Sequence, residues 1–387
     1  MTQQNVSLRK WLGDKFSTRS GTRALISPGM DFLLVGGLSC ITLAIYFLIS
    51  DGFKIEVKDE TYIVAAWLSF VINYPHFAYS YMLFYKGFVA RLFAPETEFW
   101  SRVRMSIAGL FVPALMLAYF VRAYVTQNPE YIMWALFTMI FTVGWHYVKQ
   151  AYGVLITMSV YRNIFYATWE KRILWINAYA VWAYSWCRTN STGNDIPYRH
   201  IQMKSFKFPL EVIDGSFYFA CFTTAACIAI VLNRWLSENR GISVNAVIGY
   251  ACGIYMWVMI PFMNMAFYIL IPMFHSLQYL PFVYKFKKSE LVRELERPLG
   301  DYKRSRRNFI IHALLFTVTG GVLGLLFFET IPNLLDDHYS TKLEYAGLDP
   351  LFFFFAFTVF INVHHFFIDS AFWRRDNRDA QKNLFRA

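Results

Sequence analysis

Towards its carboxyl-terminal end the chain reads PLFFFFAFTVFINVHHFFIDSAF over residues 350–372, a run with one carboxylate, Asp369, and two adjacent histidines. An α-helix needs about 20 predominantly apolar residues to cross about 30 Å of hydrocarbon. The run meets that length, and its few polar side chains then lie within the membrane. It predicts a transmembrane helix that carries a buried polar centre.

Similar apolar stretches recur along nearly all of the 387 residues. The chain is 56% hydrophobic and 16% charged, with a mean hydropathy of +0.33, whereas soluble globular proteins carry about 25% charged residues. This composition excludes a soluble domain and predicts an all-α, multi-pass integral membrane protein. The ten predicted spans are residues 31–50, 62–85, 105–125, 131–157, 173–187, 216–233, 244–261, 265–284, 308–328 and 350–372.

The positive charges predict how these spans are oriented. The formal net charge is +11, and the Lys and Arg residues concentrate in alternate connections, above all between Lys285 and Arg307. An excess of Lys and Arg marks cytoplasmic loops. We therefore expect a cytoplasmic segment at residues 1–30, a single membrane domain over 31–372 and a cytoplasmic tail at 373–387. Orientation accounts for the basic balance, so no nucleic-acid partner is expected.

Few ionisable side chains remain inside the predicted spans, and these are the candidates for function. They are His76, His146, Lys149, His275, His312, His364, His365 and Asp369. An ionisable residue at membrane depth is costly, which makes it a functional candidate by default. A single histidine can equally serve as a hydrogen-bond partner between helices.

Four of these histidines are expected to share one depth in the membrane. His76, His275 and His365 each lie nine or ten residues before the basic residue that ends their span, which is about 15 Å of helix. His146 matches them when the count starts from the opposite surface: it lies sixteen residues after Glu130, as His365 lies sixteen after Asp349 and His76 fifteen after Thr61. Hydrogen-bonding histidines have no reason to share a layer, whereas convergence on a metal ion supplies one.

His364 needs a separate interpretation, because consecutive residues of a helix point about 100° apart. It either binds a second metal ion or supports a neighbouring helix while His365 binds the first. We keep it among the candidate metal ligands, together with His76, His146, His275 and His365.

Polar companions stand three or four residues from the histidines on the same helix faces. They are Gln150, Gln278, Asn362 and Asp369. Ligating imidazoles usually donate their second N–H to a carboxylate, amide or carbonyl, so we expect these residues to support a bound cofactor. The alternative is a chain of hydrogen bonds that holds the helices together.

Three side chains are candidates for catalysis: Asp369, Lys149 and Tyr79. Lys149 and Asp369 could pair across helices, which would allow both charges to be buried. Tyr79 belongs to an aromatic set, with Phe352–Phe355 among its members, that could line a slot for a hydrophobic substrate. Aromatic residues in spans also serve packing and interface anchoring.

An imidazole-rich site suits iron, copper or zinc rather than magnesium or calcium, which prefer oxygen ligands. The His-Glu-x-x-His helix of many zinc hydrolases is absent from the sequence. We therefore expect a transition metal, iron in a mononuclear or dinuclear centre, in an oxidoreductase. Its expected partners are a hydrophobic small-molecule substrate, the membrane lipids and an electron donor where the reaction requires one.

Three short motifs carry a resemblance to a class of membrane enzymes. They are Pro75-His76-Phe77, Gly144-Trp145-His146, and Asn362-Val363-His364-His365 with Asp369. They resemble the scattered histidine motifs of integral membrane desaturases and hydroxylases, and in a general way those of bacterial carotenoid-cleaving dioxygenases. The His-x-x-His-His box of desaturases is incomplete, because residue 361 is Ile. The resemblance implies non-haem iron held by histidines.

Two other functions remain open from the sequence. Paired histidines on facing helices could be axial ligands of haem b in a quinone-linked redox protein, which would show a Soret band. A proton-coupled transporter could use Lys149, Asp369 and the membrane histidines as a relay. Such transporters often contain inverted repeats, and we find none. Uptake into proteoliposomes with and without a pH gradient separates transport from the redox functions.

The layer of imidazoles generates a first prediction. His275→Ala should lower the transition-metal content of the detergent-purified protein, because a ligand leaves the common centre. Elemental analysis and an optical spectrum of the variant beside the unchanged protein measure the effect. Equal metal content in the two samples would remove His275 from the ligand set.

Overall fold

The computed structural model describes residues 24–49, 63–64, 67–191, 196–198, 201–237, 241–259, 265–296, 302–339 and 351–385. Helices dominate these residues, as expected for an all-α membrane protein. Within them the strands are β1 (Ile196–Tyr198) and β2 (Ile201–Met203), which form a short antiparallel hairpin.

Six helical stretches in the described residues are long and apolar enough to cross a membrane. They are Pro28–Ile49, Phe99–Thr126, Glu130–Tyr161, Leu210–Leu236, Arg307–Tyr339 and Phe352–Phe372. Each coincides with one of the ten predicted spans. The described parts of the other four predicted spans also fall on helices, but these helices are not among the six. The chain is thus a helical protein of the membrane type, and the number of ten spans stays a prediction.

The chain divides into two compact units, which we describe separately. Unit 1 comprises Met1–Lys58, Tyr147–Ser191 and Phe208–Pro281, and unit 2 comprises Asp59–His146, Thr192–Lys207 and Phe282–Ala387. Two long helices supply residues to both units, α9 (Glu130–Tyr161) and α13 (Met265–Glu296). The single membrane domain over residues 31–372 stays a prediction.

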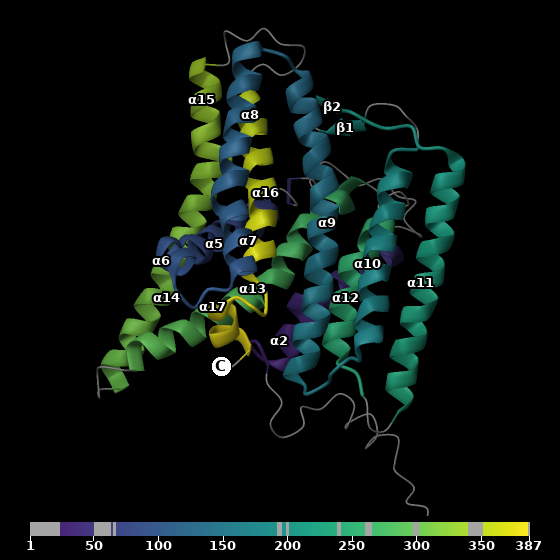
Figure 1. Ribbon diagram of the computed structural model, residues 1–387, viewed down its shortest axis with the longest axis vertical. Coiled ribbons are helices and arrows are strands. Elements are labelled where there is room, and N and C mark those ends of the chain that lie inside the picture. Colours follow the sequence, from purple (N-terminus) through teal and green to yellow (C-terminus); the bar gives the residue numbers. More distant parts are fainter. Residues whose placement is uncertain are drawn as a thin grey trace, which may run out of the picture. The chain divides into compact units, whose positions relative to one another are not determined.

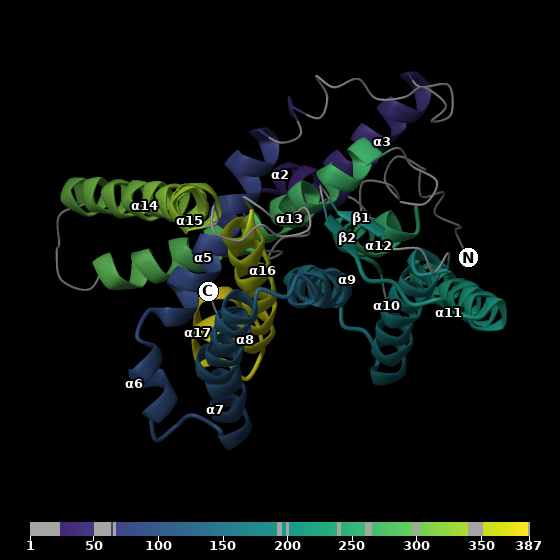
Figure 2. The ribbon, with the colours of Figure 1, turned by 90° about the horizontal axis from the view of Figure 1, so that it is seen from above.

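Unit 1 is built around a pair of adjacent helices, α10 and α11, which lie side by side in Figures 1 and 2. Its elements are α2 (Pro28–Phe32), the π-helical turn η1 (Leu33–Gly37), α3 (Leu38–Ile49), α10 (Thr168–Thr189), α11 (Leu210–Leu236) and α12 (Val244–Met259). Arg234 of α11 and Glu170 of α10 form a buried ion pair at 2.5 Å. A buried charge pair holds the two helices in register, because removal of either partner would leave the other charge buried without a counter-charge.

Unit 2 is built around α16 (Phe352–Phe372), which is buried along most of its length. Its other elements are η2 (Ser69–Asn73), α5 (Tyr74–Tyr85), α6 (Phe88–Phe93), α7 (Phe99–Ser106), η3 (Ile107–Phe111), α8 (Val112–Thr126), α14 (Tyr302–Leu325), η5 (Leu326–Thr330), α15 (Ile331–Tyr339), α17 (Arg378–Ala380) and η7 (Gln381–Phe385). Helices α5, α8 and α15 all pack against α16. The apolar core of the unit consists of side chains from α8, α9 and α16.

Pairs of glycines four residues apart allow close helix packing in each unit, as their spacing indicates. In unit 2 a Cβ atom on Gly324 would lie 2.8 Å from the backbone carbon of Tyr74, and one on Gly320 would overlap the ring of Tyr79. In unit 1 a Cβ on Gly253 would lie 2.7 Å from Cβ of Ala151. Larger residues at these positions would force the helices apart.

The carboxyl-terminal segment after α16 belongs to unit 2 and packs on it. Asp379 accepts a hydrogen bond from Arg91 at 3.1 Å, and Asp376 pairs with Arg104. Asn383 accepts a hydrogen bond from Arg293. The predicted tail at residues 373–387 is therefore docked on unit 2 as far as residue 385, and residues 1–23 of the predicted N-terminal segment lie outside the described residues.

An acidic residue beyond the predicted span 265–284 generates a prediction about pH. Glu290 is paired with Lys86 at 3.0 Å and with Lys287 at 2.6 Å. Burial raises the pKa of Glu290, but the hydrogen bonds and charges of Lys287 and Lys86 outweigh it and bring this pKa below 4.5. The carboxylate therefore stabilises the fold fully above pH 4.5, and this stabilisation is lost as the pH falls through its folded pKa.

Thermal unfolding in detergent, followed from neutral pH to below 4.5, measures the effect. Glu290→Gln should lower the melting temperature at neutral pH, and the difference from the unchanged protein should shrink below pH 4.5. A difference that stays constant across this range would contradict the assignment.

Candidate metal centre

His365 lies at the centre of the candidate site, on the buried face of α16. Its side chain is fully buried, and Asp369 stands one helical turn further on. Residues four apart on a helix share a face, and Nε2 of His365 lies 3.5 Å from Oδ2 of Asp369. The spacing His-x-x-x-Asp thus brings an imidazole and a carboxylate together on one helix.

His76 approaches His365 from the beginning of α5. The π-helical turn η2 ends at Asn73, and Pro75 occupies the first turn of α5, where the missing N–H of proline costs no helical hydrogen bond. His76 follows directly and is fully buried. The centroids of the His76 and His365 rings are 4.5 Å apart, with the rings at 78°.

His146 approaches His365 from α9. Their ring centroids are 4.9 Å apart, with the rings at 69°. The His146 ring also stacks on Phe366 at 4.6 Å and 22°, and this contact fixes the plane of the imidazole. His365 thus contacts both His76 and His146 within unit 2. These are three of the four histidines predicted to share a layer.

The ligand atoms of His146, His365 and Asp369 all lie within 4.8 Å of one another, and all three residues are buried. Metal–nitrogen and metal–oxygen bonds are about 2.0 to 2.2 Å long, so two ligands of one ion lie at most about 4.4 Å apart. Small side-chain rotations therefore suffice for these three groups to hold a single ion. From the sequence Asp369 is expected to support His365 or to act in catalysis, and the geometry allows it to be a ligand as well.

A carboxylate at this depth requires compensation for its charge. Asp369 is only 7% exposed in a helix that is apolar enough to cross the membrane. A divalent cation shared with the two imidazoles would contribute to it, and two imidazoles with one carboxylate are donors that transition-metal ions accept. The chemistry of the donor set therefore fits a metal ion.

His364 is held by hydrogen bonds to three neighbours in unit 2. Its Nε2 lies 2.9 Å from the carbonyl oxygen of Ala108, and its Nδ1 lies 2.9 Å from the hydroxyl of Tyr81. Since a carbonyl only accepts, Nε2 carries the proton and Nδ1 accepts from Tyr81. Tyr85 lies 3.3 Å from Nε2 and donates to the carbonyl of Gly109. Of the two interpretations of His364, these contacts favour support of a neighbouring helix.

His275 lies in unit 1 and stacks on Tyr147 at a centroid distance of 3.9 Å. Its ligand role stays a prediction.

The two glutamines expected to support the histidines are hydrogen-bonded to each other in unit 1. Gln150 donates to the backbone carbonyl of His275 at 3.0 Å and to the side-chain oxygen of Gln278 at 3.2 Å. Gln278 donates to the carbonyls of Val35 and Gly249, so both amides bond to backbone groups and to each other.

The remaining candidates lie as follows. Tyr79 donates to the carbonyl of Thr317 at 3.4 Å and stacks on Phe316, so it faces α14. Asn362 donates to the carbonyl of Thr358 in its own helix. Lys149 is half-buried in unit 1, and its pairing with Asp369 stays a prediction. His312 is exposed and bonds to the carbonyl of Asn308 in its own helix.

Two aromatic residues at the site were not among the sequence-based candidates. Phe77 lies with its ring 4.7 Å from those of both His76 and His365, and Phe366 stacks on His146. Each follows a candidate histidine directly in the sequence, which is the only signal that could have identified them. Together they give the imidazoles apolar neighbours.

Comparisons with protein-family models, with curated proteins and with solved structures found no match for this chain.

The contacts of His364 generate a prediction that separates it from His365. Tyr81→Phe removes the donor to Nδ1 of His364 and should destabilise the protein by about 1 to 3 kcal/mol, because a buried acceptor is left unsatisfied. His364→Ala should likewise lower the melting temperature. Both variants should keep the metal content of the unchanged protein. Elemental analysis and thermal unfolding of the same samples check this, and metal loss in either variant would make His364 a ligand.

Proposed function

We propose that the protein is an integral membrane oxidoreductase that uses a non-haem iron ion and acts on a hydrophobic substrate. The observation that carries the proposal is the buried set of His146, His365 and Asp369, whose ligand atoms lie within 4.8 Å of one another. His76 is the adjacent imidazole, in ring contact with His365. It is positioned as a fourth ligand or as a hydrogen-bonding neighbour.

The choice of iron follows from the composition of this set. Two imidazoles and one carboxylate with open positions are typical of non-haem iron oxygenases. Catalytic zinc also accepts such ligands, but hydrolysis requires water in the site. Here Phe77 and Phe366 cover the imidazoles, and an apolar surrounding of this kind suits oxidation of a hydrocarbon better than hydrolysis.

The protein side chains have distinct parts in this proposal. Asp369 would hold the cation together with His365, one turn away, and its charge would offset part of that of the ion. Phe366 fixes the plane of the His146 imidazole by stacking. Phe77 packs against the His365 ring at 71° and gives this imidazole an apolar neighbour. The fold thus holds the ligands in a buried site with aromatic neighbours before substrate arrives, and such preorganisation is the condition for precise catalysis.

Iron held by these residues would supply activation of dioxygen. Insertion of both oxygen atoms into a substrate needs no outside electrons. Hydroxylation uses one dioxygen, two electrons and two protons, and it releases one water molecule. Desaturation uses the same reactants, removes two hydrogens from the substrate and releases two water molecules. An electron donor is therefore part of the proposal only for hydroxylation and desaturation.

Haem b is less compatible with these rings. Axial imidazoles lie on opposite faces of a porphyrin, with the macrocycle between them. The rings of His76 and His146 each lie within 5 Å of His365 by centroid distance. Such edge-to-face contacts leave no space for a porphyrin between either pair.

The proposal includes the finer membrane topology expected from the sequence. We infer ten crossings with both termini on the cytoplasmic side, based on the distribution of Lys and Arg among the connections. The six long apolar helices support the membrane location itself. In this arrangement the metal centre lies within the hydrocarbon layer, where a lipid-like substrate is concentrated.

Elemental analysis of detergent-purified protein tests the proposal. We expect iron as the transition metal, at about one ion per chain if the site is mononuclear. His146→Ala, His365→Ala and Asp369→Ala should each lower the iron content about tenfold or more, because each removes a ligand. Thr358→Val, seven residues before His365 on the same helix, is the matched control.

Protein free of transition metal after purification under chelator-free conditions would contradict the proposal. A Soret band would favour haem instead. Oxygen consumption that appears on addition of a membrane lipid extract, and that is lost in His365→Ala but kept in Thr358→Val, would link the site to the reaction.

A further inference from the structure

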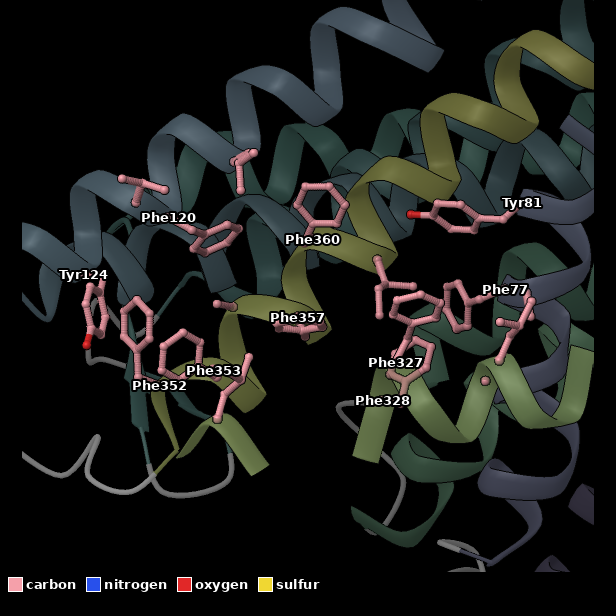
Figure 3. Close-up of a pocket in the computed structure, with 18 of the residues that line it drawn as sticks. Phe77, Tyr81, Phe120, Tyr124, Phe327, Phe328, Phe352, Phe353, Phe357 and Phe360 are labelled. Atoms are coloured by element: carbon pink, nitrogen blue, oxygen red, sulfur yellow. The ribbon is translucent and has the colours of Figure 1, made fainter. Parts of the chain in front are cut away.

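A large apolar cavity lies in unit 2 beside the candidate metal centre. Its volume is about 570 Å³, which falls within the range of small-molecule sites. The lining comes from α5, α8, α14, η5, α15 and α16, and none of these lining residues is Asp, Glu, Lys, Arg or His. Figure 3 shows aromatic rings along both walls of this cavity.

The cavity is elongated along α16. Its lining residues on this helix extend from Phe352 to Ile361, a rise of about 14 Å. Figure 3 shows Tyr124 at one end and Phe77 at the other. A long, narrow ligand therefore fits the cavity better than a compact one.

The end formed by Phe77 adjoins the metal centre. Ile361, the last lining residue of α16, precedes His365 by one helical turn on the same face. The ring of Phe77 lines the cavity and also lies 4.7 Å from the rings of His76 and His365. One aromatic ring thus separates the cavity from two imidazoles.

We propose that this cavity binds a neutral, elongated hydrocarbon chain, and that Phe77 is a positioning residue that sets how closely the end of the chain approaches the metal centre. A charged headgroup would find no counter-charge among the lining residues, so a neutral single-chain lipid is the occupant rather than a phospholipid. The identification of the bound hydrocarbon as the substrate depends on the proposed function, whereas binding of the hydrocarbon in the cavity does not.

Photo-crosslinking tests the binding. The probe is a long-chain alcohol with a diazirine at its terminal carbon, added to the protein in nanodiscs and located by mass spectrometry of peptides. We expect labels on cavity residues that an unlabelled alcohol of the same length suppresses and an excess of an anionic lysophospholipid does not.

Two variants with matched controls locate the site. Leu323→Trp fills the cavity from α14 and should lower the labelling of cavity residues about tenfold, because methylene contacts are lost. Leu314→Trp adds the same side chain at an exposed position of α14 and should leave labelling unchanged. Val121→Trp on α8, with Val125→Trp as its control, repeats the test should Leu323→Trp fail to fold.

Phe77 is tested in the same assay. Phe77→Ala should move the diazirine label onto His76 or His365, because the separating ring is gone, and Phe77→Leu should do so less. Phe120→Ala removes an equal volume from another part of the lining and should not shift the label. An unshifted label in a folded Phe77→Ala protein would overturn the positioning role.

The outcomes separate this inference from the proposed function. Labelling that is spread over outer helix faces, or that is insensitive to Leu323→Trp and Val121→Trp, means that only ordinary bilayer chains contact the protein and overturns the inference. Metal content is measured on the same samples. Specific labelling of a protein without metal would support the lipid-binding cavity and contradict the proposed function. Bound metal without specific labelling would support the proposed function and contradict the cavity inference.

Discussion

The burial of polar side chains inside apolar helices is the constraint on which unit 2 depends. Hydrocarbon offers no hydrogen bonds, so each such group must meet a partner within the protein or a bound ion. Helix α16 shows two different arrangements on adjacent residues. His364 exchanges hydrogen bonds with Tyr81 and the carbonyl of Ala108, whereas His365 turns toward His76, His146 and Asp369.

Close helix packing makes this arrangement possible. Gly320 and Gly324 let α14 approach α5, and α5 carries His76 to His365. The aromatic residues of the same helices leave an apolar cavity that ends at Phe77. The small residues therefore determine how near the helices come, and the large ones determine where space remains.

A good part of the architecture could be predicted from the sequence because it depends on single segments. Apolar length predicted membrane-type helices, and six of the ten expected spans coincide with helices of that kind. The residue spacing on α16 predicted that His365 and Asp369 share a face. The division into two units was not predicted, because hydropathy along the chain does not report which helices pack together.

The sequence by itself determined the membrane character and the short set of histidines within apolar helices, since each follows from composition or from spacing within one helix. Only the tertiary structure decided that His76, His146 and His365 meet, that Asp369 stands among possible ligands, and that His364 bonds elsewhere. The physical reason is that these contacts join residues up to about three hundred positions apart on different helices, whose mutual rotation is set by side-chain packing rather than by local periodicity.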